Sequence, residues 1–347
     1  MNKRRLGRTD TFVSELCLGS MTWGTQNTYA QAAEQIECAI DHGVNFIDTA
    51  EMYPTTPLTE KTLGDTETII GQWFNNSGRR DEIVIATKVT GNGREWMYGG
   101  QDITPEKIRI SVERSLKRLQ TDRIDLYQLH WPNRGSYHFR QNWTFDASAQ
   151  DTQKTTDNIH EVLRALEDEF KAGRIINIGL SNESCWGTST FLSIAAQHNL
   201  PRVATIQNEY NLMNRLFDLD LAELSHHEDV GLLAFSPLGA GMLSGKYSKG
   251  AKPEGSRRTM NENLGGRYTD KSAIVCEQYV SLAQEHGMDP AQMALAFCLS
   301  RPFMTSAIIG ATTMEQLKVN LGATTIELSD EVKQGIYAIY LQNPIPM

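Results

Sequence analysis

The stretch GVNFIDTAEMY, residues 43–53, decides how this chain is read. An apolar run of strand length occupies residues 44–48 and passes into polar sequence at Asp48, with Tyr53 five positions later. In a chain where strands and helices alternate, such a position is the carboxyl end of a parallel strand. An α/β barrel builds its active site from these ends, so we expect Asp48 and Tyr53 to face a site there.

Two later stretches repeat the pattern. EIVIATK, residues 82–88, ends in Lys88, and RIDLYQLHWP, residues 123–132, contains His130 just after its apolar run. An acid, a phenol, an ammonium and an imidazole would therefore meet at neighbouring strand ends. Together these four side chains could donate a proton to a substrate.

Strand-length apolar runs alternate with helical periodicity along the whole chain, which predicts an α/β fold of the (β/α)8 TIM barrel type in a single domain, residues 1–347. The competing doubly wound sheet requires a glycine-rich G-x-G-x-x-G turn after the first strand, and LGSMTWG (18–24) lacks it. The expected strands are residues 15–19, 44–48, 82–88, 123–131, 174–181, 202–207, 230–236 and 306–311. The expected helices are residues 30–42, 66–76, 103–119, 158–173, 184–198, 216–228, 270–286, 289–300 and 313–323.

Segments outside this repeat have their own interpretations. Residues 3–16, KRRLGRTDTFVSEL, read as an N-terminal β-hairpin that plugs the amino-terminal mouth of the barrel. Two connections, 132–157 and 237–269, exceed the usual loop length and are predicted to be long loops on the carboxyl-terminal face. Long loops on that face commonly carry function.

The composition narrows the classes of function. A formal net charge of −9 argues against nucleic acid and anionic membranes as partners. No apolar stretch approaches the ~20 residues of a membrane span, and the basic start lacks the apolar core of a secretory signal. The five cysteines form no CxxC pair and no zinc spacing, which favours reduced thiols in a cytoplasmic protein. His226, His227 and Glu228 end a helix without further ligands, so no metal is expected.

The chemistry of the four residues suggests roles for them. A tyrosine has a pKa near ~10 and is a poor acid at neutral pH, unless a neighbouring ammonium favours its phenolate. A buried lysine in turn needs a carboxylate to stay charged. Tyr53 is therefore the expected acid, and Lys88 is expected to lower its pKa. Asp48 is expected to keep Lys88 charged and in place, and His130 to orient a substrate oxygen. Taken singly, Asp48 also fits a helix cap, and Tyr53 or His130 a core residue.

GVNFIDTAEMY, IATK and DLYQLHWP, together with ELCLGSMTWG near the start and IIGATTMEQLKVNLGA near the end, resemble the aldo-keto reductase superfamily, and closely its bacterial Tas-like reductases. The resemblance covers essentially the whole chain. It implies a barrel that binds NADP(H) without a Rossmann domain and reduces aldehydes or ketones. It also implies that Tyr53 is the acid and base, that Lys88 and Asp48 modulate it, and that His130 orients the carbonyl.

The resemblance also implies the cofactor contacts. GLSNES and IQNEYN match the segments that hold the nicotinamide, with Tyr210 as the aromatic on which its ring stacks. The segment beginning FSPLGAG matches the loop over the pyrophosphate, and GATTMEQLKVN the adenosine end. The implied cofactor residues are Ser181, Asn182, Gln207, Tyr210, Ser236, Pro237, Leu238, Gly241, Leu243, Lys246, Arg257, Gly310, Thr312, Gln316 and Asn320.

Two departures from the family pattern matter. Many members place Lys or Arg after the last strand's glycine to hold the 2′-phosphate, whereas this chain has residues 311–313, Ala-Thr-Thr. A preference for NADP must then rest on Lys246 and on Arg257 or Arg258. Tyr53 is followed by Pro54 and an insertion, so the family's pocket at this point does not transfer. Trp23 and Trp131 are expected to line the substrate pocket.

Three functions remain open on the sequence. The first is an NADP(H)-dependent reductase of a small-molecule carbonyl substrate. The second is an NADP(H)-binding sensor with slow catalysis, of the kind found among the β-subunits of potassium channels. The third is a non-redox barrel lyase or hydrolase, which would require a metal and would bind no nicotinamide. The oligomeric state and the physiological substrate are left open.

Overall fold

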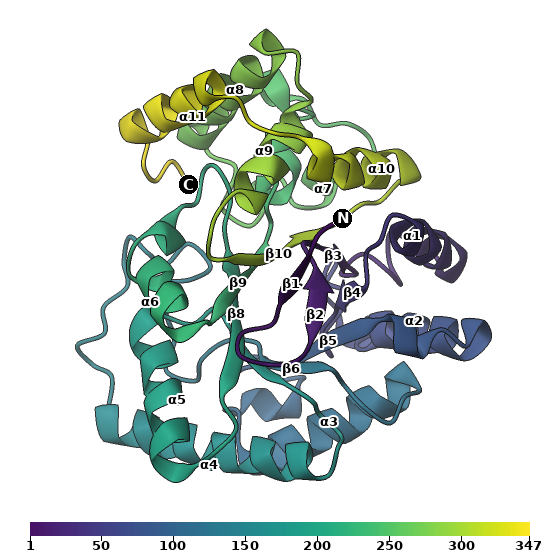
Figure 1. The fold of residues 1–347 in the computed structure, drawn as a ribbon, viewed down its shortest axis with the longest axis vertical. Coiled ribbons are helices and arrows are strands. Elements are labelled where there is room, and N and C mark those ends of the chain that lie inside the picture. Colours follow the sequence, from purple (N-terminus) through teal and green to yellow (C-terminus); the bar gives the residue numbers. More distant parts are fainter.

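The computed structural model describes all 347 residues and contains a closed barrel of eight parallel strands (Figure 1). The strands follow one another around the barrel in chain order, and β10 closes it between β3 and β9. The predicted TIM barrel is therefore confirmed. Its strands are β3 (Leu16–Gly19), β4 (Phe46–Asp48), β5 (Val84–Val89), β6 (Leu126–Leu129), β7 (Ile178–Ser181), β8 (Val203–Glu209), β9 (Gly231–Phe235) and β10 (Met304–Ile309).

The strands are mostly apolar and buried because helices cover the outer face of the barrel and side chains fill its interior. All seven residues of β8 and all six of β10 are buried. The helices are α1 (Tyr29–Asp41), α2 (Asp65–Ser77), α3 (Pro105–Leu119), α4 (Thr152–Lys171), α5 (Cys185–His198), α6 (Asp220–Glu228), α7 (Arg257–Met260), α8 (Asp270–Glu285), α9 (Pro290–Leu299), α10 (Met314–Gly322) and α11 (Asp330–Gln342).

Local sequence explains where these helices start and stop. The Thr104 hydroxyl accepts a hydrogen bond from the Lys107 backbone at the start of α3, and Pro105 occupies the first turn, as expected. Helix α4 ends just before Gly173, whose φ of +72° is the left-handed conformation that glycine adopts without strain. One face of α3, with Ile108 and Val112, is buried against the barrel.

The N-terminal hairpin lies where it was predicted. Strands β1 (Lys3–Arg5) and β2 (Phe12–Ser14) pair antiparallel and lie across the barrel opening (Figure 1). Leu6 and Val13 are fully buried in a cluster with Phe46 and Leu126, the first residues of β4 and β6. The hairpin therefore closes the amino-terminal mouth and leaves the carboxyl-terminal mouth for the site.

The sequence-based helix assignment differs from the structure most at α4 and α11. In addition, α6 begins at Asp220 instead of residue 216, and the short α7 lies in a segment expected to be a loop. Helix α4 begins at Thr152, six residues earlier than expected, because Asp151 caps it by accepting from the Lys154 backbone. Helix α11 was not expected at all. It packs beside α8 at the end of the chain (Figure 1). Its apolar periodicity is weak in the sequence because only Val332 and Ile336 of its thirteen residues are buried.

None of the helices has both the length and the apolar character needed to cross a membrane.

Candidate active site

A buried ion pair lies at the carboxyl ends of β4 and β5. The Lys88 ammonium donates to Asp48 Oδ2 at 2.7 Å and to the Thr49 carbonyl oxygen at 2.7 Å, and its side chain has no exposed surface. Asp48 Oδ1 accepts from Gln207 at 2.8 Å and Gln128 at 3.2 Å. Burial acts to lower the pKa of Lys88, but Asp48 and Tyr53 outweigh it and hold that pKa above its ordinary value. The lysine is therefore charged.

Tyr53 and His130 lie directly beside this pair. The Lys88 Nζ atom is 5.2 Å from the centre of the Tyr53 ring, and the Tyr53 and His130 ring centres are 6.1 Å apart. Burial raises the pKa of the Tyr53 phenol, while the Lys88 charge acts in the opposite direction. Tyr53 therefore carries its proton at neutral pH, and the adjacent ammonium favours its release. The structure thus brings together all four residues expected from the strand ends.

His130 is neutral in the folded protein. Burial, assisted by the Lys88 charge, holds its pKa well below the ordinary value, and its Nδ1 atom has no hydrogen-bond partner. Since the pKa in the folded state is depressed, the stability it contributes is present above the unfolded pKa of ~6.5 and is lost as the pH falls. An imidazole of this kind can donate one hydrogen bond to a substrate oxygen without carrying charge.

This gives a prediction for acid stability. Between about pH 7.5 and pH 5, the wild type should lose up to about 2 kcal/mol more unfolding free energy than His130→Gln. Urea unfolding at both pH values measures the difference. His138, whose pKa burial lowers to about 4, is present in both proteins and cancels in the comparison. Equal losses in the two proteins would contradict the assignment of a neutral His130.

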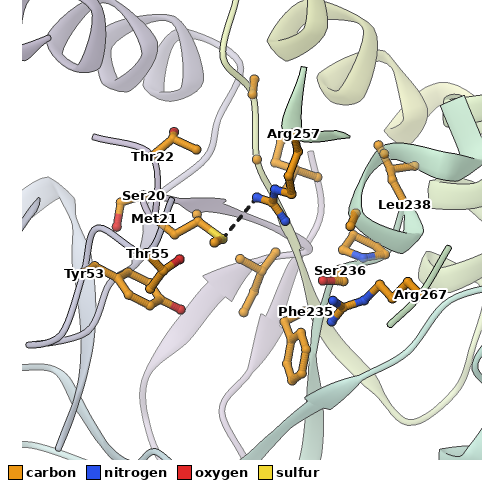
Figure 2. Close-up of a pocket in the computed structure, with 18 of the residues that line it drawn as sticks. Ser20, Met21, Thr22, Tyr53, Thr55, Phe235, Ser236, Leu238, Arg257 and Arg267 are labelled. Atoms are coloured by element: carbon orange, nitrogen blue, oxygen red, sulfur yellow. Dashed lines mark hydrogen bonds between the residues drawn. The ribbon is translucent and has the colours of Figure 1, made fainter. Parts of the chain in front are cut away.

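Asp48, Tyr53 and His130 line a cavity of about 1450 Å³ on the carboxyl-terminal face. Figure 2 shows Tyr53 and Met21 on one side of it, Phe235 and Ser236 on the other, and Arg257 between them. Ordinary small-molecule pockets reach roughly 1,000 Å³, so this cavity has room for a cofactor and a substrate together. Lys88 does not line the cavity but lies buried beside Tyr53. The other implied residues that line it are Ser181, Asn182, Gln207, Ser236, Pro237, Leu238, Gly241, Lys246, Arg257, Gly310, Thr312, Gln316 and Asn320.

Asn182 and Gln207 present unpaired carbonyl oxygens next to the four residues. Asn182 donates both to the His130 carbonyl oxygen and to the Ser181 hydroxyl, which leaves its buried Oδ1 atom without a partner. The Gln207 amide nitrogen donates to Asp48 and Gln128, and its own oxygen accepts no bond from the protein. A buried acceptor without a partner is costly. The pair therefore fits the N–H₂ group of a carboxamide such as that of nicotinamide.

Two cations line the cavity without any carboxylate partner. Lys246 forms no hydrogen bond, and Arg257 donates only to the Met21 sulfur at 3.4 Å (Figure 2). Burial lowers the pKa of both groups. Arg258 is not available as an alternative, because it stacks on Tyr268 at 3.6 Å and donates to backbone carbonyl groups. Uncompensated positive charge of this kind fits the phosphates of a dinucleotide.

Three of the expected contacts are wrong. Trp23 is fully buried and donates its indole N–H to Gln35, so it packs in the core instead of lining the substrate pocket. Leu243 also packs in the core. Tyr210 is fully buried, donates to Asp218 at 2.7 Å and stacks on Phe297, because the chain has already turned out of the barrel there.

The aromatic wall opposite Tyr53 is instead Phe235, the last residue of β9 (Figure 2). The next residue, Ser236, has a φ of +51°, a rarely populated conformation for serine, and it turns the chain across the cavity. The sequence signal that could have identified Phe235 was its position immediately before Ser236 and Pro237.

The segment 132–157 contributes one aromatic side chain to the cavity. Among the aromatic residues of the segment 132–157, only Phe139 lines the cavity, packing edge-on against Trp131 at 6.1 Å between ring centres. Trp143 is 65% exposed.

The two long loops are joined by one buried carboxylate that the sequence did not reveal. Glu209, the last residue of β8, accepts from Arg140 of one loop at 3.1 Å and from Arg267 of the other at 2.6 Å. The loops therefore form one rim over the cavity. No group of three or more His, Cys, Asp or Glu side chains is arranged to hold a metal ion.

Several known proteins are similar to this chain. The model of the aldo/keto reductase family matches residues 15–340. Protein tas of Escherichia coli is 44% identical over 98% of this chain and 98% of its own length. The norsolorinic acid reductase stcV of Emericella nidulans is 30% identical over 92% of this chain and 76% of its own length. A probable voltage-gated potassium channel subunit beta of Arabidopsis thaliana is 31% identical over 94% and 92% of the two lengths.

Proposed function

The chain belongs to the aldo/keto reductase family, and on that premise we propose that it is an NADP(H)-dependent oxidoreductase that reduces aldehydes or ketones to alcohols. The observation that carries the proposal is the buried pair of Lys88 and Asp48 beside a protonated Tyr53. A lysine held charged by a buried carboxylate next to a phenol suits proton donation to a substrate oxygen. We also propose a cytoplasmic location, which the five free cysteines support.

Each of the four residues has one task in this scheme. NADPH, when bound, would supply the hydride. His130, neutral at physiological pH, donates a hydrogen bond to the carbonyl oxygen and orients it. As negative charge develops on that oxygen, Tyr53 donates its proton, and the Lys88 charge stabilises the resulting phenolate. Asp48 keeps Lys88 charged and in place.

The residues around the four would hold the cofactor. Asn182 and Gln207 would accept from the carboxamide of the nicotinamide, with Ser181 completing that group, and Phe235 would pack against the ring. Lys246 and Arg257 would neutralise phosphate charge. The remaining loop contacts are Ser236, Pro237, Leu238 and Gly241, and those of the adenosine end are Gly310, Thr312, Gln316 and Asn320.

The substrate side of the cavity favours apolar carbonyl compounds. Its walls near Tyr53 are Met21, Met52, Trp131 and Phe139, with no acidic side chain among them. Flat aromatic substrates suit a wall of this kind because aromatic rings and thioethers pack closely against them. The likeness to a reductase that acts on norsolorinic acid agrees with this choice.

A titration followed by an assay tests the proposal. Purified protein should quench or shift NADPH fluorescence on binding, bind NADPH more tightly than NADH, and oxidise NADPH in the presence of aromatic aldehydes or ketones. Lys246→Met and Arg257→Met should each weaken NADPH binding by roughly 10–100-fold, because each removes a charge-assisted hydrogen bond. Lys249→Met, which removes an exposed cation from the same loop, is the matched control.

The outcomes separate the alternatives. A larger loss for NADPH than for NADH assigns a cation to the 2′-phosphate, and an equal loss assigns it to the pyrophosphate. Equal affinity of the wild type for both cofactors would contradict the NADP preference. Tight NADPH binding without turnover on any carbonyl would favour a sensor, the function suggested by the potassium channel relative. Absence of nicotinamide binding would refute the proposal and favour a non-redox enzyme.

A further inference from the structure

Glu51 is a buried carboxylate two residues before Tyr53, and the scheme above gives it no task. It is 1% exposed and forms no ion pair. Its Oε1 atom accepts from the Thr90 backbone N–H at 2.7 Å, and its Oε2 atom accepts from the Tyr98 hydroxyl at 2.7 Å and the Ser111 hydroxyl at 2.6 Å. A carboxylate buried on neutral donors alone is costly unless all of them are well placed.

These bonds fasten the segment that carries Tyr53 to the end of β5, the strand that carries Lys88. The backbone N–H of Glu51 donates to the Lys88 carbonyl oxygen at 3.3 Å, while its side chain accepts from Thr90 on the other side of Val89. The Lys88 ammonium in turn donates to the Thr49 carbonyl oxygen of the same segment. Glu51 therefore hydrogen-bonds to the end of β5 on both sides of Val89.

The network also reaches the strand that carries His130. Tyr127, in the middle of β6, donates from its hydroxyl to Ser111 Oγ at 2.7 Å. The Ser111 hydroxyl in turn donates a hydrogen bond to Glu51. Both Tyr127 and Ser111 are fully buried. Glu51 is thus the final acceptor of a chain of hydrogen bonds on the outer side of the barrel wall, linking β4, β5, α3 and β6.

We infer that Glu51 is a positioning residue that sets the distance between the Tyr53 phenol and the Lys88 ammonium. Glu51 does not line the cavity, so it contacts neither cofactor nor substrate. It acts through the backbone on either side of the reacting pair. The inference rests on the proposed function, because proton donation by Tyr53 is what the positioning serves.

Glu51→Gln tests this with almost no change of shape. Both carboxylate oxygens accept, whereas a glutamine amide offers one acceptor and two donors, so at least one of the three donors loses its partner. We expect kcat to fall by roughly 10–100-fold, as for a small misplacement of reacting groups, while the Kd of NADPH stays near that of the wild type. The loss should lie in kcat and not in the KM of the carbonyl.

A second readout does not need turnover. Ultraviolet difference titration of each protein against its own Tyr53→Phe partner, without added cofactor, reports the pKa of Tyr53. Lys88 of β5, Asp48 of β4, His130 beyond β6 and Arg257 of α7 are the groups around this phenol, and Glu51→Gln alters none of them. If the Lys88 charge moves away, the pKa of Tyr53 should rise.

Glu67→Gln is the matched control. Glu67 is a second fully buried carboxylate, on α2, and accepts from Thr87 at 2.6 Å and from Arg118 at 2.7 Å. Its carboxylate forms no hydrogen bond with residues 49–53, so its loss should lower stability and leave kcat and the Tyr53 titration close to the wild type. Tyr98→Phe removes a single donor to Glu51 from a half-buried site, and should change both readouts in the same direction as Glu51→Gln but by less.

The inference is overturned if Glu51→Gln and Tyr98→Phe both titrate Tyr53 as the wild type does. It is also overturned if Glu67→Gln lowers kcat as much as Glu51→Gln, since the effect would then be general destabilisation. Its failure differs from failure of the proposed function. If the wild type reduces no carbonyl, the reductase proposal fails, whereas the Tyr53 titration still decides the role of Glu51.

Discussion

Tyr53→Phe should reduce kcat by roughly a thousandfold or more while leaving NADPH binding near that of the wild type. Proton donation by a positioned side chain contributes typically 10²–10⁴-fold to a rate. Tyr53 is the only phenol beside the Lys88 charge, so no neighbouring group can replace it. His130 cannot take over, because the depression of its pKa leaves it neutral and a weak acid.

The substitution is structurally mild, which makes the result easy to interpret. It removes one oxygen atom and keeps the ring that packs near His130 and Lys88. Steady-state kinetics with an aromatic aldehyde and a fluorescence titration with NADPH measure the two effects. Tyr29→Phe, which removes a surface phenol bonded to Asn76, is the control for loss of a hydroxyl elsewhere. Turnover of Tyr53→Phe within tenfold of the wild type would assign the proton to another donor.

The parts of this molecule that follow local rules could be predicted from its sequence. Parallel strands are buried on both faces, so most of them read as apolar runs such as Gly231–Phe235. Polar residues that end such runs must lie at one mouth of the barrel, which is why Asp48, Lys88 and His130 could be placed together. The N-terminal hairpin could also be predicted, and its Leu6 and Val13 are buried against the barrel.

The direction of a side chain beyond a strand end could not be predicted. Tyr210 and Phe235 are both aromatic residues at strand ends, and only the course of the following backbone decides which one faces the cavity. The turn at Ser236 sends Phe235 inward, whereas Tyr210 reaches outward to Asp218. The prediction that Trp23 lines the pocket was wrong for a similar reason, because its indole N–H donates to Gln35 within the core.

Contacts between distant residues leave no local trace in the sequence. Glu51 and Ser111 are 60 residues apart, and Glu209 lies 69 residues from Arg140 and 58 from Arg267. Each of these carboxylates is buried, yet its sequence neighbours look like ordinary loop residues. The cavity cations were visible as residues but not as unpaired charges, since Arg257 and Arg258 are adjacent and only the fold shows that Arg258 is engaged.

Lys88→Met should abolish turnover and also destabilise the protein. The substitution leaves Asp48 buried with two amide donors, Gln207 and Gln128, and no cation. Removing one partner of a buried ion pair costs roughly 3–5 kcal/mol, because the remaining charge is not compensated. Without the ammonium, the pKa of Tyr53 should rise further, because Lys88 is the largest influence that lowers it. The proton would then be harder to donate.

A double variant separates the structural loss from the chemical one. In Asp48→Asn with Lys88→Met neither position carries a charge, and the new amide can still accept from Gln207, so most of the lost stability should return. Activity should not return, since the ammonium that favours the phenolate is still absent. Urea unfolding and steady-state kinetics on the two single variants and the double variant measure both effects. Recovery of turnover together with stability would show that Lys88 only supports the fold and that the acidity of Tyr53 is set by other groups.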